Sequence, residues 1–291
     1  MNDKKKFLLN TAERAARVLP TGVKKAIYRI PFLSRFIRQR LNDAVPNGIQ
    51  EVTVAAGTLK GARLSLDLRA EKDYWLGTYE ADLQTAAEVF IQSGMTVYDV
   101  GANIGYISLI AANLVGEDGK VYSFEALPEN INRLRENIRL NDLDGRMQVC
   151  HYAVVDHSGE TTFYTHESGA MGKAVGSAGR QEEYSQTIQV RAVALDDFIF
   201  KEGNPAPQVI KMDIEGGEKL AVQGMKRTLA EVKPILLVEL HGEEAARSVW
   251  EALMENGYTV HALRKGYPVI RSLANLDWKT YVLAKPGKTE I

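Results

Sequence analysis

Short apolar runs alternate with segments of helical period between residues 97 and 256. The apolar runs have the length of buried strands, whereas the segments between them place apolar residues every three or four positions, as amphipathic helices do. The expected strands are 97–100, 120–124, 147–155, 209–212 and 234–240, and the expected helices are 104–114, 128–140, 217–232 and 243–256. Because strands that alternate with helices form a parallel sheet covered on both faces, this pattern predicts a doubly wound α/β fold.

Two more strands are expected near the C-terminus, at residues 258–263 and 278–283, with no helical pattern between them. A parallel return needs a connection of about a dozen residues, usually a helix, so these strands are expected to be antiparallel. Together with the five strands above, they make seven expected strands. Upstream of that sheet, residues 51–68 alternate around two glycine turns and predict a hairpin, and residues 79–92 predict a helix.

Residues 156–208 interrupt the alternation of strands and helices. Strand-like residues 161–165 and 187–193 flank a glycine-rich segment, 166–186, that predicts a mobile loop. Long loops in compact domains are uncommon and often functional, so we expect this one to cover the substrate side of the fold. The side chains expected to line that side are Tyr164, Met171 and Tyr184.

The N-terminal segment, residues 1–45, predicts basic helices broken by proline. Residues 1–40 contain eleven Lys or Arg and two Asp or Glu, a balance of +9, so the remainder of the chain carries −10. Leu33, Phe36, Ile37 and Leu41 recur at helical spacing among arginines. Such a helix either packs on the main domain or contacts a membrane surface, since it combines apolar and basic faces. We therefore expect an N-terminal extension, residues 1–50, and one domain, residues 51–291.

The composition of the chain argues against several classes of protein. The net charge of −1 is unlike that of a dedicated nucleic-acid-binding protein, which carries a basic excess. A single cysteine, Cys150, cannot form an internal disulfide, and no Cys/His cluster has the spacing of a structural zinc site. No apolar run is long enough for a membrane span, and no signal peptide is evident. A cytoplasmic location is expected, with membrane association through residues 1–45 left open.

The strongest chemical signal is the turn between the strand 97–100 and the helix 104–114. It reads Asp99-Val-Gly101-Ala-Asn103-Ile-Gly105, in which the two glycines permit close backbone approach to a ligand. A dinucleotide-binding turn, G-x-G-x-x-G, would require glycine at Asn103 and Tyr106, so that motif is not matched. The charge of Asp99 would repel a diphosphate, but it would suit a ligand that carries an ammonium and a sulfonium, such as S-adenosylmethionine.

Acidic residues also follow the next strands. Glu125 ends the strand 120–124, where a carboxylate can accept both hydroxyls of a ribose. Asp213, Glu215 and Glu218 follow the strand 209–212, and Glu239 and His241 end the strand 234–240. Strand carboxyl ends in open α/β sheets meet in one ligand crevice, so these groups are candidates for catalysis.

The residues leave several roles open for these groups. They could hold a metal such as Mg²⁺, position the amino group of a cofactor, or act as general base for a substrate hydroxyl. Asp213 and His241 are the candidate bases. Glu215 and Glu218 can also be read as first-turn residues that stabilise a helix dipole. The sequence contains no support for Mg²⁺ beyond the presence of these donors.

Five motifs in this order resemble the FkbM-type methyltransferases over about residues 70–285. They begin at Asp99, Phe124, Leu195, Ile210 and Leu237, and read DVGANIGYIS, FEALPEN, LDDF, IKMDIEGGE and LVELH. The resemblance implies a class I methyltransferase that uses S-adenosylmethionine. Its fold would be a mostly parallel, seven-stranded sheet of the Rossmann-like type, with the last two strands antiparallel. The same resemblance implies O-methylation of a hydroxyl on a sugar, glycan, lipid-linked or natural-product acceptor. One departure is Ala126, where the family often has proline.

The resemblance also implies positions for the cofactor. Asp99, Gly101, Asn103 and Gly105 would surround its methionine part, and Glu125 would hold its ribose. Ala153 would lie near the adenine, Asp213 would border the cofactor and the transferred methyl, and Glu80 would reach the cofactor from the preceding helix. Asp213, His241 and Glu215 are the catalytic candidates.

Two other functional classes are weighed against a methyltransferase. A nucleotide-dependent oxidoreductase of the NAD type shares the architecture, but Asn103 and Tyr106 argue against it. A non-catalytic scaffold bound to membranes through residues 1–45 would not need the acids at strand ends. The predicted partner is a small-molecule or glycan acceptor rather than nucleic acid, and the sequence does not indicate an oligomeric state.

Overall fold

The computed structural model describes residues 47–166, 172–178, 184–278 and 280–287, together with Thr11, Arg14, Ala15 and Val45. The chain forms two compact units, Met1–Gln84 and Thr85–Ile291. The boundary expected at residue 50 and the membrane contact expected of residues 1–45 stay predictions, because most of that segment lies outside the described residues. Within the described residues, no helix combines the length and the apolar character needed to cross a membrane.

The hairpin and the following helix agree with the sequence. Strands β1 (Ile49–Thr53) and β2 (Arg63–Asp67) pair antiparallel, with Thr53 opposite Arg63. A short helix α4 (Lys72–Leu76) follows, and then α5 (Ala81–Phe90). The predicted helix at 79–92 is therefore confirmed.

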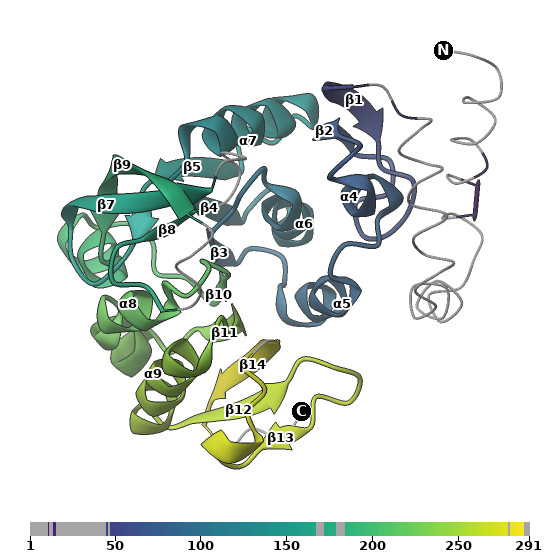
Figure 1. The fold of residues 1–291 in the computed structure, drawn as a ribbon. Coiled ribbons are helices and arrows are strands. Elements are labelled where there is room, and N and C mark those ends of the chain that lie inside the picture. Colours follow the sequence, from purple (N-terminus) through teal and green to yellow (C-terminus); the bar gives the residue numbers. More distant parts are fainter. Residues whose placement is uncertain are drawn as a thin grey trace. The chain divides into compact units, whose positions relative to one another are not determined.

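The main sheet has the predicted parallel centre with antiparallel strands at one edge (Figure 1). Five strands pair parallel with one another, in the order β5-β4-β3-β10-β11. Beyond β11, the strands β14, β12 and β13 pair antiparallel. Eight strands take part rather than seven, because the two-residue β13 extends the edge. The strands are β3 (Thr96–Val100), β4 (Lys120–Glu125), β5 (Met147–His151), β10 (Val209–Met212), β11 (Ile235–Glu239), β12 (Tyr258–Ala262), β13 (Val269–Ile270) and β14 (Tyr281–Pro286).

Side chains of each central strand alternate between two buried faces. Tyr98, Phe124 and Met212 belong to one large apolar cluster, which also contains residues of α8 (Glu218–Gln223) and α9 (Glu243–Glu255). The intervening side chains point to the opposite face, where α6 (Tyr106–Val115) packs on β3 and β4. Helix α7 (Pro128–Leu140) packs on β5. Both faces are covered, as a doubly wound fold requires.

The predicted strand 147–155 is in fact two strands of different sheets. The chain turns at Tyr152, whose N–H donates to the Cys150 carbonyl, and the next two residues leave the main sheet. They form β6 (Ala153–Val154), which pairs parallel with β9 (Tyr184–Val193). Strands β7 (Gly159–His166) and β8 (Gly172–Ala174) complete this four-stranded sheet. An apolar run alone cannot show that its two halves pair with different neighbours.

The loop expected at 166–186 is partly a strand. Residues 172–174 form β8, which pairs antiparallel with β7 and places Tyr164 opposite Lys173. Met171 lies outside the described residues, as do the rest of residues 167–171 and residues 179–183. The expectation of a loop is therefore wrong for β8, and the role of this segment on the substrate side stays a prediction.

The helix expected at 217–232 is interrupted near Gly224. Helix α8 ends at Gln223, and a separate π-helical segment η2 (Thr228–Val232) follows. A Cβ at Gly224 would lie 2.1 Å from the Val155 carbonyl oxygen, so the backbone turns where it touches another segment. The Asp196 carboxylate accepts the N–H groups of Arg227 and Thr228 and caps the second segment from outside. Two further short helical segments are η1 (Asp197–Lys201) and η3 (Leu273–Asn275).

Candidate active site

The turn between β3 and α6 packs against the loop that follows β10. Gly101 has a φ of +79°, and a Cβ there would lie 1.9 Å from the carbonyl oxygen of Asp213. Gly105 has a φ of +92°, and its Cβ would lie 2.4 Å from Cδ1 of Leu134. Asn103 also has a positive φ, 51°, which asparagine tolerates better than most residues. Glycine is therefore required at 101 because the turn lies against the backbone of Asp213, whereas Gly105 lies against a leucine side chain. The close approach of these glycines to a ligand stays a prediction.

Asp99 is buried in β3 and is neutralised inside the protein. The Ser108 hydroxyl in α6 donates to its Oδ2 at 2.5 Å, and the Lys211 Nζ lies 3.2 Å from its Oδ1. Lys211 is opposite Asp99 in the register of β10 and β3, and it also donates to the Gly101 carbonyl at 3.0 Å. The Asp99 side chain is 1% exposed, so its charge holds Lys211 and the turn and does not face solvent.

Glu125 connects the same turn to the start of α7. Its Oε2 accepts the Asn103 N–H at 2.8 Å, and its Oε1 accepts the N–H groups of Ala126 and Leu127 at 2.9 and 2.8 Å. Burial raises the pKa of Glu125, whereas these bonds and one from the Asn130 side chain lower it. A carboxylate has about four acceptor positions, so a ribose hydroxyl would have to replace one of these donors.

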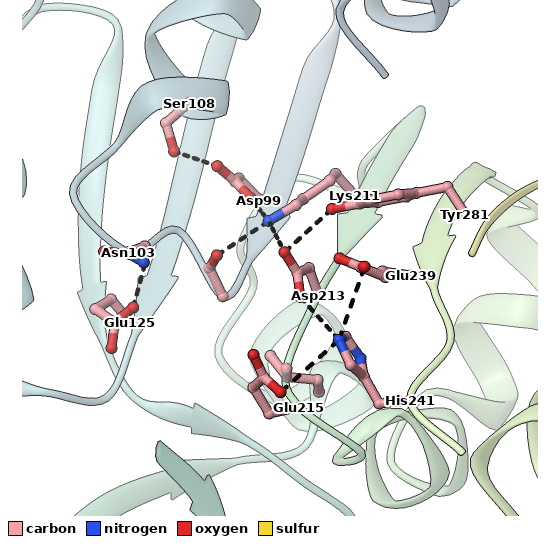
Figure 2. A network of polar contacts seen from close by, with 12 residues as sticks. Asp99, Asn103, Ser108, Glu125, Lys211, Asp213, Glu215, Glu239, His241 and Tyr281 are labelled. Atoms are coloured by element: carbon pink, nitrogen blue, oxygen red, sulfur yellow. Dashed lines mark hydrogen bonds and ion pairs between the residues drawn. The ribbon is translucent and has the colours of Figure 1, made fainter. Parts of the chain in front are cut away.

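Asp213 directly follows β10 and presents its two oxygens to different neighbours (Figure 2). Its Oδ2 accepts the Tyr281 hydroxyl at 3.1 Å and lies 3.7 Å from Lys211 Nζ. Its Oδ1 lies 3.8 Å from His241 Nε2. Tyr281 begins β14, opposite Glu239 of β11, so the antiparallel strand next to β11 reaches this site. One oxygen of Asp213 is thus held in place while the other faces the histidine.

His241 follows β11 and is surrounded by carboxylates. Its Nδ1 lies 3.0 Å from Oε1 of the fully buried Glu218. Its Nε2 lies 3.8 Å from Glu215 and 3.9 Å from Glu239, in addition to Asp213. Burial alone would lower the pKa of His241, but the Glu218 hydrogen bond and the nearby carboxylates outweigh it and raise the pKa to about 9. At neutral pH the imidazole is protonated in this arrangement and cannot accept another proton.

We expect the free energy of unfolding of the metal-free protein to decrease between pH 6.5 and 9 because of His241. The folded pKa lies above the ordinary value of about 6.5, so the stabilisation is complete below that pH and is lost as the pH rises through about 9. A shift of this size corresponds to about 3 kcal/mol at most. Urea unfolding of wild type and His241→Gln in EDTA checks it, and identical pH dependence in the two proteins would contradict it.

The loop after β10 also meets the smaller sheet. Glu215 has a positive φ of 53°; burial raises the pKa of its carboxyl, and the nearby His241 opposes this. A Cβ at the next residue, Gly216, would lie 2.1 Å from the Ala178 carbonyl oxygen, and the Ala178 N–H donates to the Gly216 carbonyl at 2.9 Å. Residues 172–178 therefore pack on the loop that carries Asp213 and Glu215.

The structure places some of the predicted site residues close together and others apart. Asp99, Asp213, Glu215 and His241 form one polar network, and Asn103 and Glu125 lie together at the neighbouring turn (Figure 2). Ala153 lies in β6 of the smaller sheet. Glu80 belongs to the unit Met1–Gln84, so its approach to the cofactor stays a prediction.

Two contributors, Lys211 and Tyr281, were not assigned a role from the sequence, and Glu218 was left with several. Lys211 is a charged residue inside an otherwise apolar strand, and alternation could have placed it beside Asp99. Glu218 was read as a first-turn helix residue, and it does occupy the first turn of α8, but its side chain is fully buried against His241. Tyr281 carries no sequence signal, because its contact with Asp213 depends on the register of β14.

The parallel sheet, its antiparallel edge and the acids at successive strand ends define a class I, Rossmann-like methyltransferase fold. The Methyltransferase FkbM domain family matches residues 99–260, more than half of the chain, and the chain belongs to this family. It therefore contains an S-adenosylmethionine-dependent methyltransferase domain. This assignment decides between the methyltransferase and the oxidoreductase interpretations in favour of the first.

Two curated relatives share this region. Hexuronic acid methyltransferase AglP of Haloferax volcanii is 29% identical over 159 residues, which cover 55% of this chain and 61% of AglP. The 31-O-demethyl-FK506 methyltransferase FkbM of Streptomyces tacrolimicus is 27% identical over 201 residues, which cover 60% of this chain and 76% of that protein. The similarity thus spans less than two thirds of AglP.

Solved structures resemble the fold more distantly. The methyltransferase FkbM of Methylobacillus flagellatus KT is 18% identical, with a TM-score of 0.47 over 75% of this chain and 53% of that one. An S-adenosylmethionine-dependent O-methyltransferase of Thermotoga maritima is 15% identical, with a TM-score of 0.43 over 89% of this chain and 83% of that one. Likenesses at this distance support no functional assignment.

Proposed function

We propose that this protein transfers a methyl group from S-adenosylmethionine to a hydroxyl oxygen of a sugar-like or natural-product acceptor. The observation that carries the proposal is the acidic network around Asp213 and His241, which lies directly against the Gly101 turn. The names of the two relatives specify a hexuronic acid and the 31-O-demethyl form of FK506, and both are consistent with an oxygen-bearing small-molecule acceptor.

The charges in this network fit a cationic methyl donor. Five carboxyl groups lie in it, and the described cationic side chains beside them are Lys211, His241 and Lys173, which interacts with Glu215, so carboxyl groups outnumber cations. The carboxyl groups are those of Asp99, Asp213, Glu215, Glu218 and Glu239. When bound, S-adenosylmethionine supplies a methyl group on a positively charged sulfur. The same excess of negative charge disfavours an anionic acceptor carboxylate and favours a neutral hydroxyl.

On the acceptor side, we assign the role of general base to Asp213. Its Oδ1 is the oxygen that faces the site, and it would take the proton of the acceptor hydroxyl as the new bond to oxygen forms. Tyr281 and Lys211 hold its Oδ2 and fix the direction of the carboxylate. His241 is protonated beside it in the metal-free protein, so we assign His241 to positioning rather than to proton removal, and Glu215 stays a second candidate to accept the proton.

On the cofactor side, the close-packed turn supplies the backbone surface. Gly101, Asn103 and Gly105 would lie against the methionine part of the cofactor, and Glu125 would bind its ribose after exchange of one donor. The roles of Glu80 at the cofactor and of Ala153 near the adenine follow from the family resemblance. Holding donor and acceptor close together is itself a large source of rate enhancement in such reactions.

A transfer assay with tritiated-methyl S-adenosylmethionine tests the proposal. We expect more label on neutral hydroxyl-bearing acceptors, such as hexose glycosides and macrolide alcohols, than on hexuronic acid glycosides, and none on matched analogues in which the methylated hydroxyl is replaced by hydrogen. The label should resist mild base, because an ether is stable where a methyl ester is hydrolysed. Label that is released by base, or found only on amines, would contradict O-methylation of a hydroxyl.

A further inference from the structure

Three side chains at the ends of β10 and β11 are arranged as metal ligands are. One donor atom each from Asp213, Glu239 and His241 lies within 4.8 Å of the others. The His241 Nε2 lies 3.8 Å from Asp213 Oδ1 and 3.9 Å from Glu239 Oε1. Ligand atoms about 2.1 Å from one ion lie about 3.0 to 3.6 Å apart at angles of about 90 to 120°, so the three side chains would have to move toward a bound ion by roughly an ångström.

The residues behind these three supply a second, independent observation. Glu218 is fully buried, its Oε1 accepts a hydrogen bond from His241 Nδ1 at 3.0 Å, and its Oε2 has no hydrogen-bond partner among the described residues. A histidine that binds a metal usually donates its other ring N–H to a carboxylate in this way, which leaves Nε2 directed at the ion. Tyr281 and Lys211 orient Asp213 through the oxygen that does not face the histidine.

We propose that Asp213, Glu239 and His241 bind a divalent transition-metal ion. Two carboxylates favour Mn²⁺, and an imidazole favours first-row transition ions over Mg²⁺, so Mn²⁺ suits the mixed set. Binding displaces the imidazole proton and places two positive charges where carboxylates are in excess. Three protein ligands leave positions open for water or for an acceptor oxygen.

The consequence for catalysis rests on the proposed function. An acceptor hydroxyl bound to the ion would have a lowered pKa, so its proton would pass more readily to a carboxylate such as Glu215, whose side chain is 37% exposed beside the site. Metal binding itself does not depend on that function, since it requires only the three ligands and the buried Glu218.

A competing arrangement has no metal, with the protonated His241 as the internal cation. The two arrangements differ in a direct measurement. Titration of chelator-treated, full-length protein with Mn²⁺, followed by electron paramagnetic resonance, should show one saturable site that binds Mn²⁺ more tightly than Mg²⁺. Glu239→Gln and His241→Gln should each weaken Mn²⁺ binding by more than about 10-fold, because loss of even an outer-shell partner costs about 10- to 100-fold.

The matched control is Glu243→Gln, which removes a carboxylate from the exposed start of α9 and should leave Mn²⁺ affinity unchanged. Circular dichroism and S-adenosylhomocysteine binding, measured on each variant, report whether it is folded. Absence of saturable Mn²⁺ binding to wild type, or equal affinity in wild type and both ligand variants, would overturn the metal site. If wild type binds S-adenosylhomocysteine but not Mn²⁺, only the metal proposal is contradicted. If it binds Mn²⁺ but not S-adenosylhomocysteine, only the methyltransferase proposal is contradicted.

Discussion

Replacement of Asp213 by Asn should lower the rate of methyl transfer at least 100-fold while the affinity for S-adenosylhomocysteine changes little. Asparagine keeps the shape of the side chain and can still accept the Tyr281 hydroxyl, but it cannot take a proton. Removal of a general base costs about 10²- to 10⁴-fold in rate, and loss of a metal ligand acts in the same direction. Lys211 keeps Asp99 as its partner, so the turn should persist.

The measurement is kcat with tritiated donor at saturating acceptor, together with calorimetric titration of the product. Asp144→Asn, on the exposed surface, provides the matched control and should behave as wild type. A D213N protein with full turnover would remove Asp213 from proton transfer.

Replacement of Gly101 by Ala should have the largest effect on stability and cofactor affinity together. The added Cβ would lie 1.9 Å from a backbone oxygen, which cannot rotate away as a side chain can, and the φ of +79° is itself strained for alanine. We expect a loss of about 2–4 kcal/mol in the free energy of unfolding and at least a tenfold weaker affinity for S-adenosylhomocysteine.

Gly94→Ala separates the clash from the backbone strain. Gly94 has a similar φ of +82°, but a Cβ there meets no atom within 4 Å. This variant should lose only about 1 kcal/mol and should bind the product normally. Equal losses of stability in G101A and G94A, measured by urea unfolding, would show that the approach of the turn to Asp213 is not what requires glycine at 101.

The order of strands and helices in the main sheet was predictable because each apolar run is buried on both faces and bounded by turn residues. Pairing partners were less accessible to prediction. Residues 147–155 form one apolar run, but Ala153 and Val154 pair with β9, nearly forty residues farther along the chain. The break in the helix 217–232 depends on Asp196, which caps it from a distant segment.

The site was predictable where its residues stand at strand ends. Asp99, Asp213 and His241 follow from strand alternation and from the rule that strand carboxyl ends converge. The surroundings of each group could not be predicted, because they depend on side chains that are distant in the sequence. Asp99 was expected to face a ligand but is closed off by Ser108 and Lys211. His241 was a candidate base, yet the buried Glu218 keeps it protonated.

The acid-rich network and its glycine turn are expected to bind the methyl donor, and the remaining roles of these residues follow from that binding. Isothermal titration of the purified full chain with S-adenosylhomocysteine should give saturable one-to-one binding in the micromolar range, with no heat from NAD. Glu125→Gln should bind the same ligand more weakly, because the amide cannot accept all of the hydrogen bonds that hold the turn. A flat titration with S-adenosylhomocysteine, or binding of NAD in its place, would contradict the account.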